Sequence, residues 1–137
     1  KPALADDSGL EVYALKGAPG TLSARYAGED ADDIKNIEKL LSEMRMISEG
    51  ERGARFVCYI AFAFPDGSVE TFSGYVEGRI GREPKGRKGF GYDPVFYPEG
   101  HNRTFAEMSG DEKDALSHRG KALRELRKYL EGIKPNF

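Results

Sequence analysis

Two adjacent carboxylates, Asp6 and Asp7, stand near the start of the chain and are followed by Ser8 and Gly9. The apolar run at residues 3–5 predicts a short strand that leads into this group. Ligands of α/β proteins usually bind at the ends of strands, where two carboxylates could hold Mg²⁺ or one could take a proton from water. Asp, Ser and Gly are also ordinary turn residues, and taken alone this stretch favours a plain turn.

A second candidate is the glycine-rich stretch at residues 79–93, R-I-G-R-E-P-K-G-R-K-G-F-G-Y-D. Residues 80–91 are glycine-rich and basic, so we expect a loop there, and glycines also allow the backbone to approach a ligand closely. The whole stretch contains one acid, Glu83, and five basic residues: Arg79, Arg82, Lys85, Arg87 and Lys88. Phe90 and Tyr92 flank Gly91, so an aromatic face could stack on a base. The alternative is a solvated basic loop with Phe90 in the core. The presence of aromatic residues inside a glycine-rich loop favours ligand binding over this alternative.

A third group combines Lys113 with His118 and Arg119, which follow Ser117. All three side chains can donate hydrogen bonds, so they could recognise a carbonyl-bearing base or hold a phosphate. The alternative is structural, with Ser117 capping a helix and the next two residues forming its solvated first turn.

The elements that position these groups follow from hydrophobic spacing. Apolar residues three and four apart predict a helix over residues 32–47, and a second helix is expected from about 118 to 130. Its buried face would consist of Ala122, Leu123, Leu126 and Leu130. The apolar run 56–64 predicts a strand covered on both faces, joined by a turn at 65–67 to a partner strand at 69–76.

A short strand at 95–97 and a loop with a helical turn at 107–114 complete the pattern. Strands interleaved with helices predict an α/β fold with a mixed β-sheet flanked by helices. The length of 137 residues fits a single domain, residues 1–137, that can bury a core.

Composition excludes several classes of protein. The net charge of −2 does not suggest a nucleic-acid binder, and no apolar stretch approaches the roughly 20 residues that span a bilayer. Cys58 is the only cysteine, which excludes an internal disulfide and favours a cytoplasmic protein. The chain opens with Lys1-Pro2, without an initiator Met, and runs directly into an apolar stretch, so we expect it to begin inside a domain.

Taken together and in this order, four segments resemble the inosine triphosphate pyrophosphatase family. They are A-D-D-S-G-L with G-A-P-G and S-A-R-Y-A-G (residues 5–28), G-F-G-Y-D-P-V-F (89–96), T-F-A-E-M (104–108) and E-K-D-A-L-S-H-R-G-K-A-L (112–123). The resemblance covers nearly the whole chain and is far more specific than a single glycine motif.

The resemblance implies a role for each matching residue. Asp7 matches the aspartate assigned as general base and magnesium ligand, with Asp6 beside it. Ser8 matches a substrate contact. The loop that stacks on and frames the purine is matched by Phe90, Gly91, Tyr92 and Asp93. The residues that recognise the base are matched by Lys113, His118 and Arg119. Asp114 stands where the family often has Asn.

The function implied is hydrolysis of non-canonical purine nucleoside triphosphates to the monophosphate and pyrophosphate, with Mg²⁺ as cofactor and a homodimer as the expected assembly. The family also begins with a strand, a T-x-N-x-x-K loop that grips the triphosphate, and an acidic residue that helps to hold Mg²⁺. These lie outside this sequence, so we expect little or no activity from the 137-residue chain alone. Two alternatives stay open: a nucleotide-binding fragment without turnover, and a related phosphatase acting on canonical nucleotides.

Overall fold

The computed structural model describes residues 3–132, without the side chains of residues 3–6, 118–120, 123 and 130–132. Its strands and longer helices follow one another along the chain as β1 (Ala3–Val12), β2 (Pro19–Gly20), α1 (Asp33–Glu43), β3 (Gly53–Ala63), β4 (Val69–Ile80), β5 (Phe96–Pro98), α2 (Gly110–Leu116) and α3 (His118–Gly132). None of the helices within residues 3–132 is long and apolar enough to cross a membrane.

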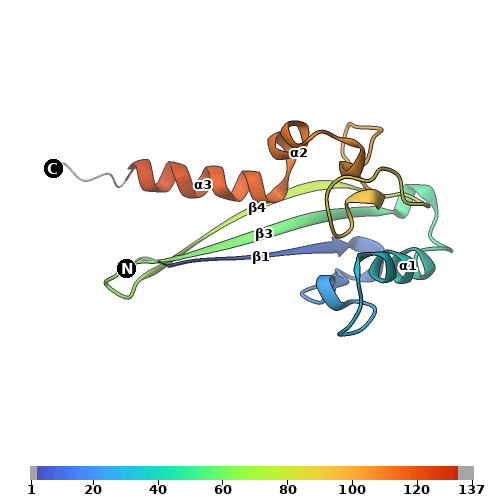
Figure 1. Ribbon diagram of the computed structural model, residues 1–137, viewed down its shortest axis with the longest axis horizontal. Helices are drawn as coiled ribbons and strands as arrows, with labels where there is room; N and C mark the ends of the chain where they lie inside the picture. Colours follow the sequence, from blue (N-terminus) through green and yellow to red (C-terminus); the bar gives the residue numbers. More distant parts are fainter. Residues whose placement is uncertain (1–2, 133–137) are drawn as a thin grey trace.

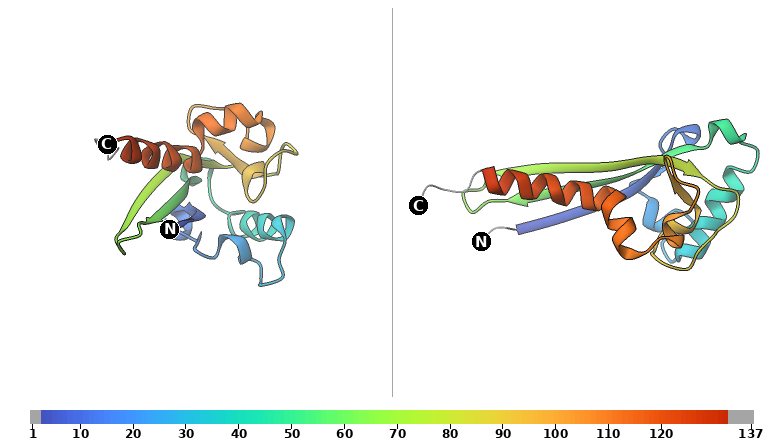
Figure 2. Two further views of the ribbon diagram at one scale, coloured as in Figure 1. Left: turned by 60° about the vertical axis from the view of Figure 1, so that its left-hand side comes forward. Right: turned by 90° about the horizontal axis from the view of Figure 1, so that it is seen from above.

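The strands form one sheet in the order β2-β1-β3-β4-β5. Its three long strands, β1, β3 and β4, run side by side, and α3 lies along β3 and β4 (Figures 1 and 2). Helix α1 and the loop that leads to β5 gather at one end of these strands, and the β3–β4 turn lies at the other (Figure 1). The predicted α/β class is confirmed. All four pairings among the described strands are antiparallel, however, so the parallel pairing that a mixed sheet requires does not occur among them.

The turn predicted at residues 6–9 is wrong, and so is the prediction that the strand ends just before them. These residues lie inside β1, which pairs with β3 without interruption from Ala3 opposite Ala63 to Val12 opposite Ala54. Continuous pairing with a long apolar strand overrides the local turn preference of Asp, Ser and Gly, which is a weak bias. Gly9 fits this environment because a Cβ atom there would lie 2.7 Å from the carbonyl oxygen of Gly20 in β2.

The predicted helix at 32–47 is confirmed but shorter, since α1 ends at Glu43. Asp32 caps it by accepting a hydrogen bond from the Lys35 backbone N–H at 2.8 Å. Its apolar face joins the main core, which contains Ile37, Leu40, Leu10, Phe56, Phe96 and Phe105.

The strand predicted at 56–64 is confirmed as β3, but it is not covered on both faces. Cys58 and Ile60 pack under α3, against Ala122 and Leu126, whereas Tyr59 points to the opposite side and is 53% exposed. The burial predicted for Ala122 and Leu126 is therefore confirmed, and the side chains of Leu123 and Leu130 lie outside the described residues.

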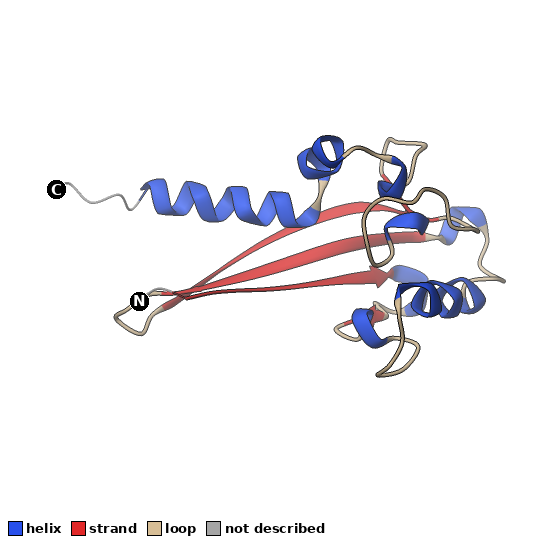
Figure 3. Cartoon of the chain, in the orientation of Figure 1, coloured by secondary structure: helices blue, strands red, loops and turns tan. Residues whose placement is uncertain are grey.

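The hairpin of β3 and β4 is confirmed, with Ala63 opposite Val69. A loop connects β4 to β5 as predicted and is drawn in tan in Figure 3. Residues 107–114 are more ordered than expected, because α2 begins at Gly110 behind a capping box made by Ser109 and Glu112. Ser117 ends α2 and immediately precedes α3.

Candidate active site

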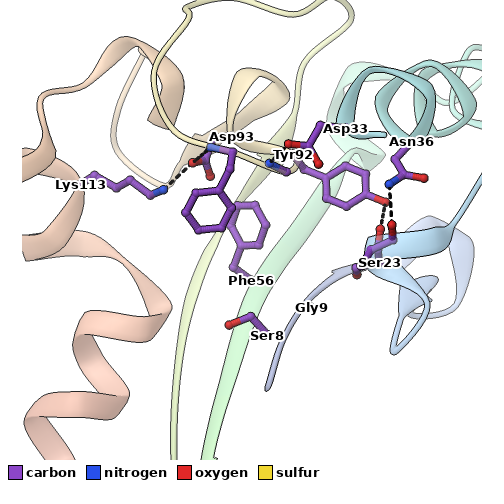
Figure 4. Close-up of a pocket in the computed structure, with 12 residues that line it drawn as sticks. Ser8, Gly9, Ser23, Asp33, Asn36, Phe56, Tyr92, Asp93 and Lys113 are labelled. Carbon is purple, nitrogen blue, oxygen red and sulfur yellow. Dashed lines mark hydrogen bonds and ion pairs between the residues drawn. The ribbon is translucent and has the colours of Figure 1, made fainter. Parts of the chain in front are cut away.

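A cavity of about 180 Å³ opens between the sheet, α1, α2 and the loop that precedes β5 (Figure 4). Twelve residues line it: Ser8, Gly9, Ser23, Ala24, Asp33, Asn36, Phe56, Phe90, Gly91, Tyr92, Asp93 and Lys113. The structure therefore brings together Ser8, the whole aromatic loop 90–93 and Lys113, which the sequence predicted as substrate-binding residues on three separate elements.

Lys113 and Asp93 form an ion pair at one side of the cavity (Figure 4). Both side chains are largely buried, with 16% of Lys113 and 4% of Asp93 exposed. The Lys113 Nζ also lies 4.4 Å from the centre of the Phe90 ring, a cation–π distance. An ammonium has three donor positions, so Lys113 keeps donors for a ligand while one is directed at Asp93.

Asp93 also accepts a hydrogen bond from the Phe90 backbone N–H, at 3.1 Å. Burial raises the pKa of the Asp93 carboxyl, while the Lys113 ammonium and the Phe90 N–H act in the opposite direction. Gly89 makes this arrangement possible: its φ is +79°, and a Cβ atom there would collide with the Asp93 carboxylate.

The Phe90 ring itself is 69% exposed, so it does not belong to the core. An exposed aromatic ring next to a cation, at the mouth of a cavity, is suited to stacking on a planar base. The structure thus favours the ligand-binding interpretation of the glycine-rich loop over a purely structural one.

The other side of the cavity is held by hydrogen bonds between segments far apart in the sequence. The Tyr92 hydroxyl donates to the carbonyl oxygen of Ser23 at 2.6 Å, and the Gly91 N–H donates to Asp33 Oδ2 at 2.9 Å. Burial raises the pKa of the Tyr92 hydroxyl, and the nearby Asp33 carboxylate adds to the effect. Tyr92 is therefore a neutral donor and not an ionised group.

Asn36 completes this side. Its Nδ2 donates to the carbonyl oxygen of Ala24 at 3.0 Å, and its Oδ1 accepts from the Ala27 N–H at 2.9 Å. Sequence reasoning missed Asn36, Ser23 and Asp33 as site residues. A signal existed for Asn36: it lies four residues before Leu40, so it is a polar residue on the apolar face of α1.

Asp7 does not line this cavity. Side chains alternate along a strand, so Asp7 and Ser8 face opposite sides of the sheet. Asp7 lies in a small second recess together with Glu11 and Tyr59, and Ser8 and Gly9 border both hollows. The side chains of Asp6, His118 and Arg119 lie outside the described residues, although His118 and Arg119 begin α3 directly after the segment that carries Lys113.

The described residues contain no group of three or more His, Cys, Asp or Glu side chains that could hold a metal ion. Mg²⁺, however, is commonly bound through one or two carboxylates together with substrate phosphates and water. The exposed Asp7 carboxylate fits a site of that open kind, whereas Glu11, in the same recess, is already paired with Arg55 at 2.7 Å.

Comparison with known proteins identifies relatives of this chain. The model of the Ham1 family matches residues 1–129. The chain is 54% identical to the dITP/XTP pyrophosphatase of Halalkalibacterium halodurans over 131 residues, which are 96% of this chain and 68% of that protein. It is 50% identical to the dITP/XTP pyrophosphatase of Bacillus subtilis, again over 96% of this chain and over 66% of the relative.

Solved structures of Ham1 proteins are also similar to this chain. The Ham1 protein of Staphylococcus aureus superimposes with a TM-score of 0.93 at 47% identity, over 98% of this chain and 69% of that one. A HAM1 protein from Coxiella burnetii gives a TM-score of 0.89, also at 47% identity, over 96% and 68% of the two chains. The chain thus spans about two thirds of the length of the relatives that it matches, from 62% to 68% for the first three curated ones.

Proposed function

The chain belongs to the Ham1 family, and from that premise we propose that it hydrolyses non-canonical purine nucleoside triphosphates, those of inosine, deoxyinosine and xanthosine, to the monophosphate and pyrophosphate. The relatives named above are dITP/XTP pyrophosphatases, which are hydrolases acting on nucleoside triphosphates. The observation that supports the proposal most is the shared cavity, in which Ser8, Phe90 and Lys113 meet from three distant parts of the chain.

The base would occupy the cavity, stacked on the exposed Phe90 ring. Inosine and xanthosine have a carbonyl at purine position 6, where adenine has an amine. The Lys113 ammonium suits a carbonyl, and an adenine amine in the same place would face a second donor. Because an unmatched buried polar group is costly, such a site can reject the wrong base strongly. Resemblance adds His118 and Arg119 to this donor group.

The phosphates would extend across β1 towards Asp7, since Ser8 and Gly9 border both the cavity and the Asp7 recess. There the Asp7 carboxylate would orient or deprotonate the water that attacks the α-phosphate, a role worth about 10²–10⁴ in rate. Asp6 would assist from the neighbouring position. When bound, Mg²⁺ would neutralise charge on the triphosphate, and Asp7 is the residue proposed to hold it. A homodimer is proposed with the activity on the family resemblance alone, and a cytoplasmic location on the single cysteine of the chain.

The test is pyrophosphate release from inosine, xanthosine, adenosine and guanosine triphosphates, with Mg²⁺ and with a chelator. It should be run on the 137-residue chain and on the same chain joined to the N-terminal strand and T-x-N-x-x-K loop of a relative. We expect little turnover by the first and Mg²⁺-dependent turnover of the inosine and xanthosine substrates by the second. Equal turnover of adenosine triphosphate would support a phosphatase for canonical nucleotides, and binding without turnover in both proteins would support a binding module.

A further inference from the structure

Asp33 links two walls of the cavity that are far apart in the sequence. Its carboxylate accepts the Gly91 N–H at 2.9 Å, across 58 residues of chain, and the residue lines the cavity from the first turn of α1. The helix does not need this side chain as a cap, because the neighbouring Asp32 already accepts the Lys35 N–H. The Asp33 carboxylate is therefore directed at the aromatic loop and not at its own helix.

This contact closes a ring of hydrogen bonds. Asp33 of α1 accepts a hydrogen bond from Gly91, and the next residue, Tyr92, donates to Ser23. Ala24, which follows Ser23, accepts a hydrogen bond from Asn36, which again belongs to α1. Tyr92, Ser23 and Asn36 are buried, whereas Asp33 is exposed. The Asp33 link is thus the part of the ring that can be removed without opening the core.

This ring of hydrogen bonds fixes the backbone next to Phe90. Gly91 has a φ of +60°, a conformation that few residues other than glycine adopt, and its N–H is fixed by Asp33. The preceding Phe90 N–H is fixed by Asp93. The Phe90 ring is 69% exposed, so its position depends on these two backbone anchors and on the Lys113 ammonium, 4.4 Å from its centre.

We propose that Asp33 is a positioning residue for nucleotide binding, which holds the Gly91 amide so that the Phe90 ring is already set to stack on the base. Fixing a contact surface before the ligand arrives reduces the entropy lost on binding and so raises affinity. The proposal rests on the proposed function of the cavity as the site of the purine base.

The experiment compares three variants by calorimetric titration with inosine monophosphate, which offers no triphosphate to hydrolyse, and by thermal unfolding. Asp33→Ala removes the acceptor and should raise the Kd by about 2- to 12-fold, the range of one exposed hydrogen bond, with little change in Tm. Asp33→Asn keeps an acceptor oxygen and should restore a Kd within about 2-fold of the unchanged protein. Asp32→Ala removes only the helix cap and should lower Tm by about 4 °C with an unchanged Kd.

An unchanged Kd in Asp33→Ala, or an equal loss in Asp33→Asn and Asp33→Ala, would overturn the positioning role while leaving the proposed function intact. Absence of inosine monophosphate binding by the unchanged protein would overturn the proposed function and this role with it. Hydrogen exchange at the Gly91 amide of the free protein separates the geometry from the ligand. It should accelerate in Asp33→Ala and not in Asp33→Asn, and equal rates would contradict the Asp33–Gly91 link.

Discussion

The Lys113 ammonium is surrounded by one carboxylate and two aromatic rings. Asp93 pairs with it, the Phe90 ring centre lies 4.4 Å away, and the Phe105 ring centre 5.9 Å away. Removing one member of a buried ion pair leaves the other charge without compensation, which is more damaging than the pair is stabilising. The pair therefore matters chiefly for holding the Lys113 donors at the mouth of the cavity.

This pair gives a prediction for pH dependence. Burial raises the pKa of Asp93, and Lys113 opposes that rise, so Lys113→Met should raise the Asp93 pKa further. A carboxyl with a higher pKa in the folded state binds its proton more tightly there than in the unfolded chain. The free energy of unfolding of Lys113→Met should therefore fall as the pH rises from about 4, the unfolded value, to the folded pKa.

Urea unfolding between pH 4 and pH 8 measures this slope, and the matched control is the double variant Lys113→Met with Asp93→Asn, in which the slope should disappear. The same slope in both proteins would show that another group is responsible. Inosine monophosphate binding should also weaken in Lys113→Met, since its donors are gone.

At the scale of elements, the sequence predicts those helices, strands and loops whose positions are determined by hydrophobic periodicity and turn residues. The helix at 33–43, the hairpin of β3 and β4 and the loop before β5 follow from hydrophobic spacing and from the Pro65-Asp66-Gly67 turn. Residues 6–9 were misassigned because their strand is imposed by pairing with β3, a contact across about 50 residues that local preferences do not contain.

The same limit applies to the site. The aromatic loop and Lys113 could be singled out by residue type and by family resemblance. Asp33 and Ser23 could not, because their importance lies in hydrogen bonds to residues 91 and 92, which only the folded chain brings near. Asn36 had one sequence signal, as a polar residue on the apolar face of a helix, but its partners at residues 24 and 27 are also visible only in the folded chain.

Gly89, next to the aromatic loop, and Gly91, within it, allow a matched comparison. Gly89→Ala would place a Cβ atom against the Asp93 carboxylate, at a φ of +79°, and should displace Asp93 from Lys113. Gly91→Ala meets nothing within 4 Å and should show only the strain of its positive φ, about 1–2 kcal/mol. Thermal unfolding and inosine monophosphate titration should therefore show the larger loss of both stability and affinity in Gly89→Ala. Equal losses would mean that the Asp93 contact adds nothing beyond backbone strain.

Helix α2, which carries Lys113, is fixed at its start by Glu112. This carboxylate pairs with Arg103 and accepts the Ser109 N–H, and these contacts lower its pKa to about 2. A carboxyl with a lowered folded pKa contributes stability above its unfolded value of 4.5, and that contribution is lost as the pH falls towards 2. Arg103→Met should raise the Glu112 pKa towards 4.5, as measured by an NMR titration of its side chain. A value still near 2 would assign the shift to Ser109 instead.

At the scale of the whole molecule, the long antiparallel strands carry two separate coverings. Helix α3 packs on Cys58 and Ile60 along β3, whereas α1 and the loops close the end that holds the cavity. The cavity depends on the second covering, because α1 and the aromatic loop form facing walls. The connection that carries the aromatic loop begins where β4 ends, at Ile80. The two walls keep their positions only if the segment that follows α1 stays next to this point.

Arg52 holds these two parts together. It is 2% exposed, and its guanidinium donates to Ile80 at 2.8 Å, Gly81 at 2.8 Å, Met44 at 2.7 Å and Ile47 at 3.2 Å, all through backbone carbonyl oxygens. Only a planar group with several fixed donors can serve so many acceptors at once, so lysine is not an equivalent replacement.

Arg52→Met should therefore lower the free energy of unfolding by about 3 kcal/mol or more, because several buried carbonyl groups lose their partners. Urea unfolding measures the loss, and Arg82→Met is the matched control: Arg82 also donates to the Ile47 carbonyl oxygen, at 3.0 Å, but its side chain is 48% exposed. Its replacement should change stability by about 1 kcal/mol or less. Inosine monophosphate binding should weaken in Arg52→Met and not in Arg82→Met. If both variants unfold alike, the two walls of the cavity must be joined by the hydrophobic core and not by this guanidinium.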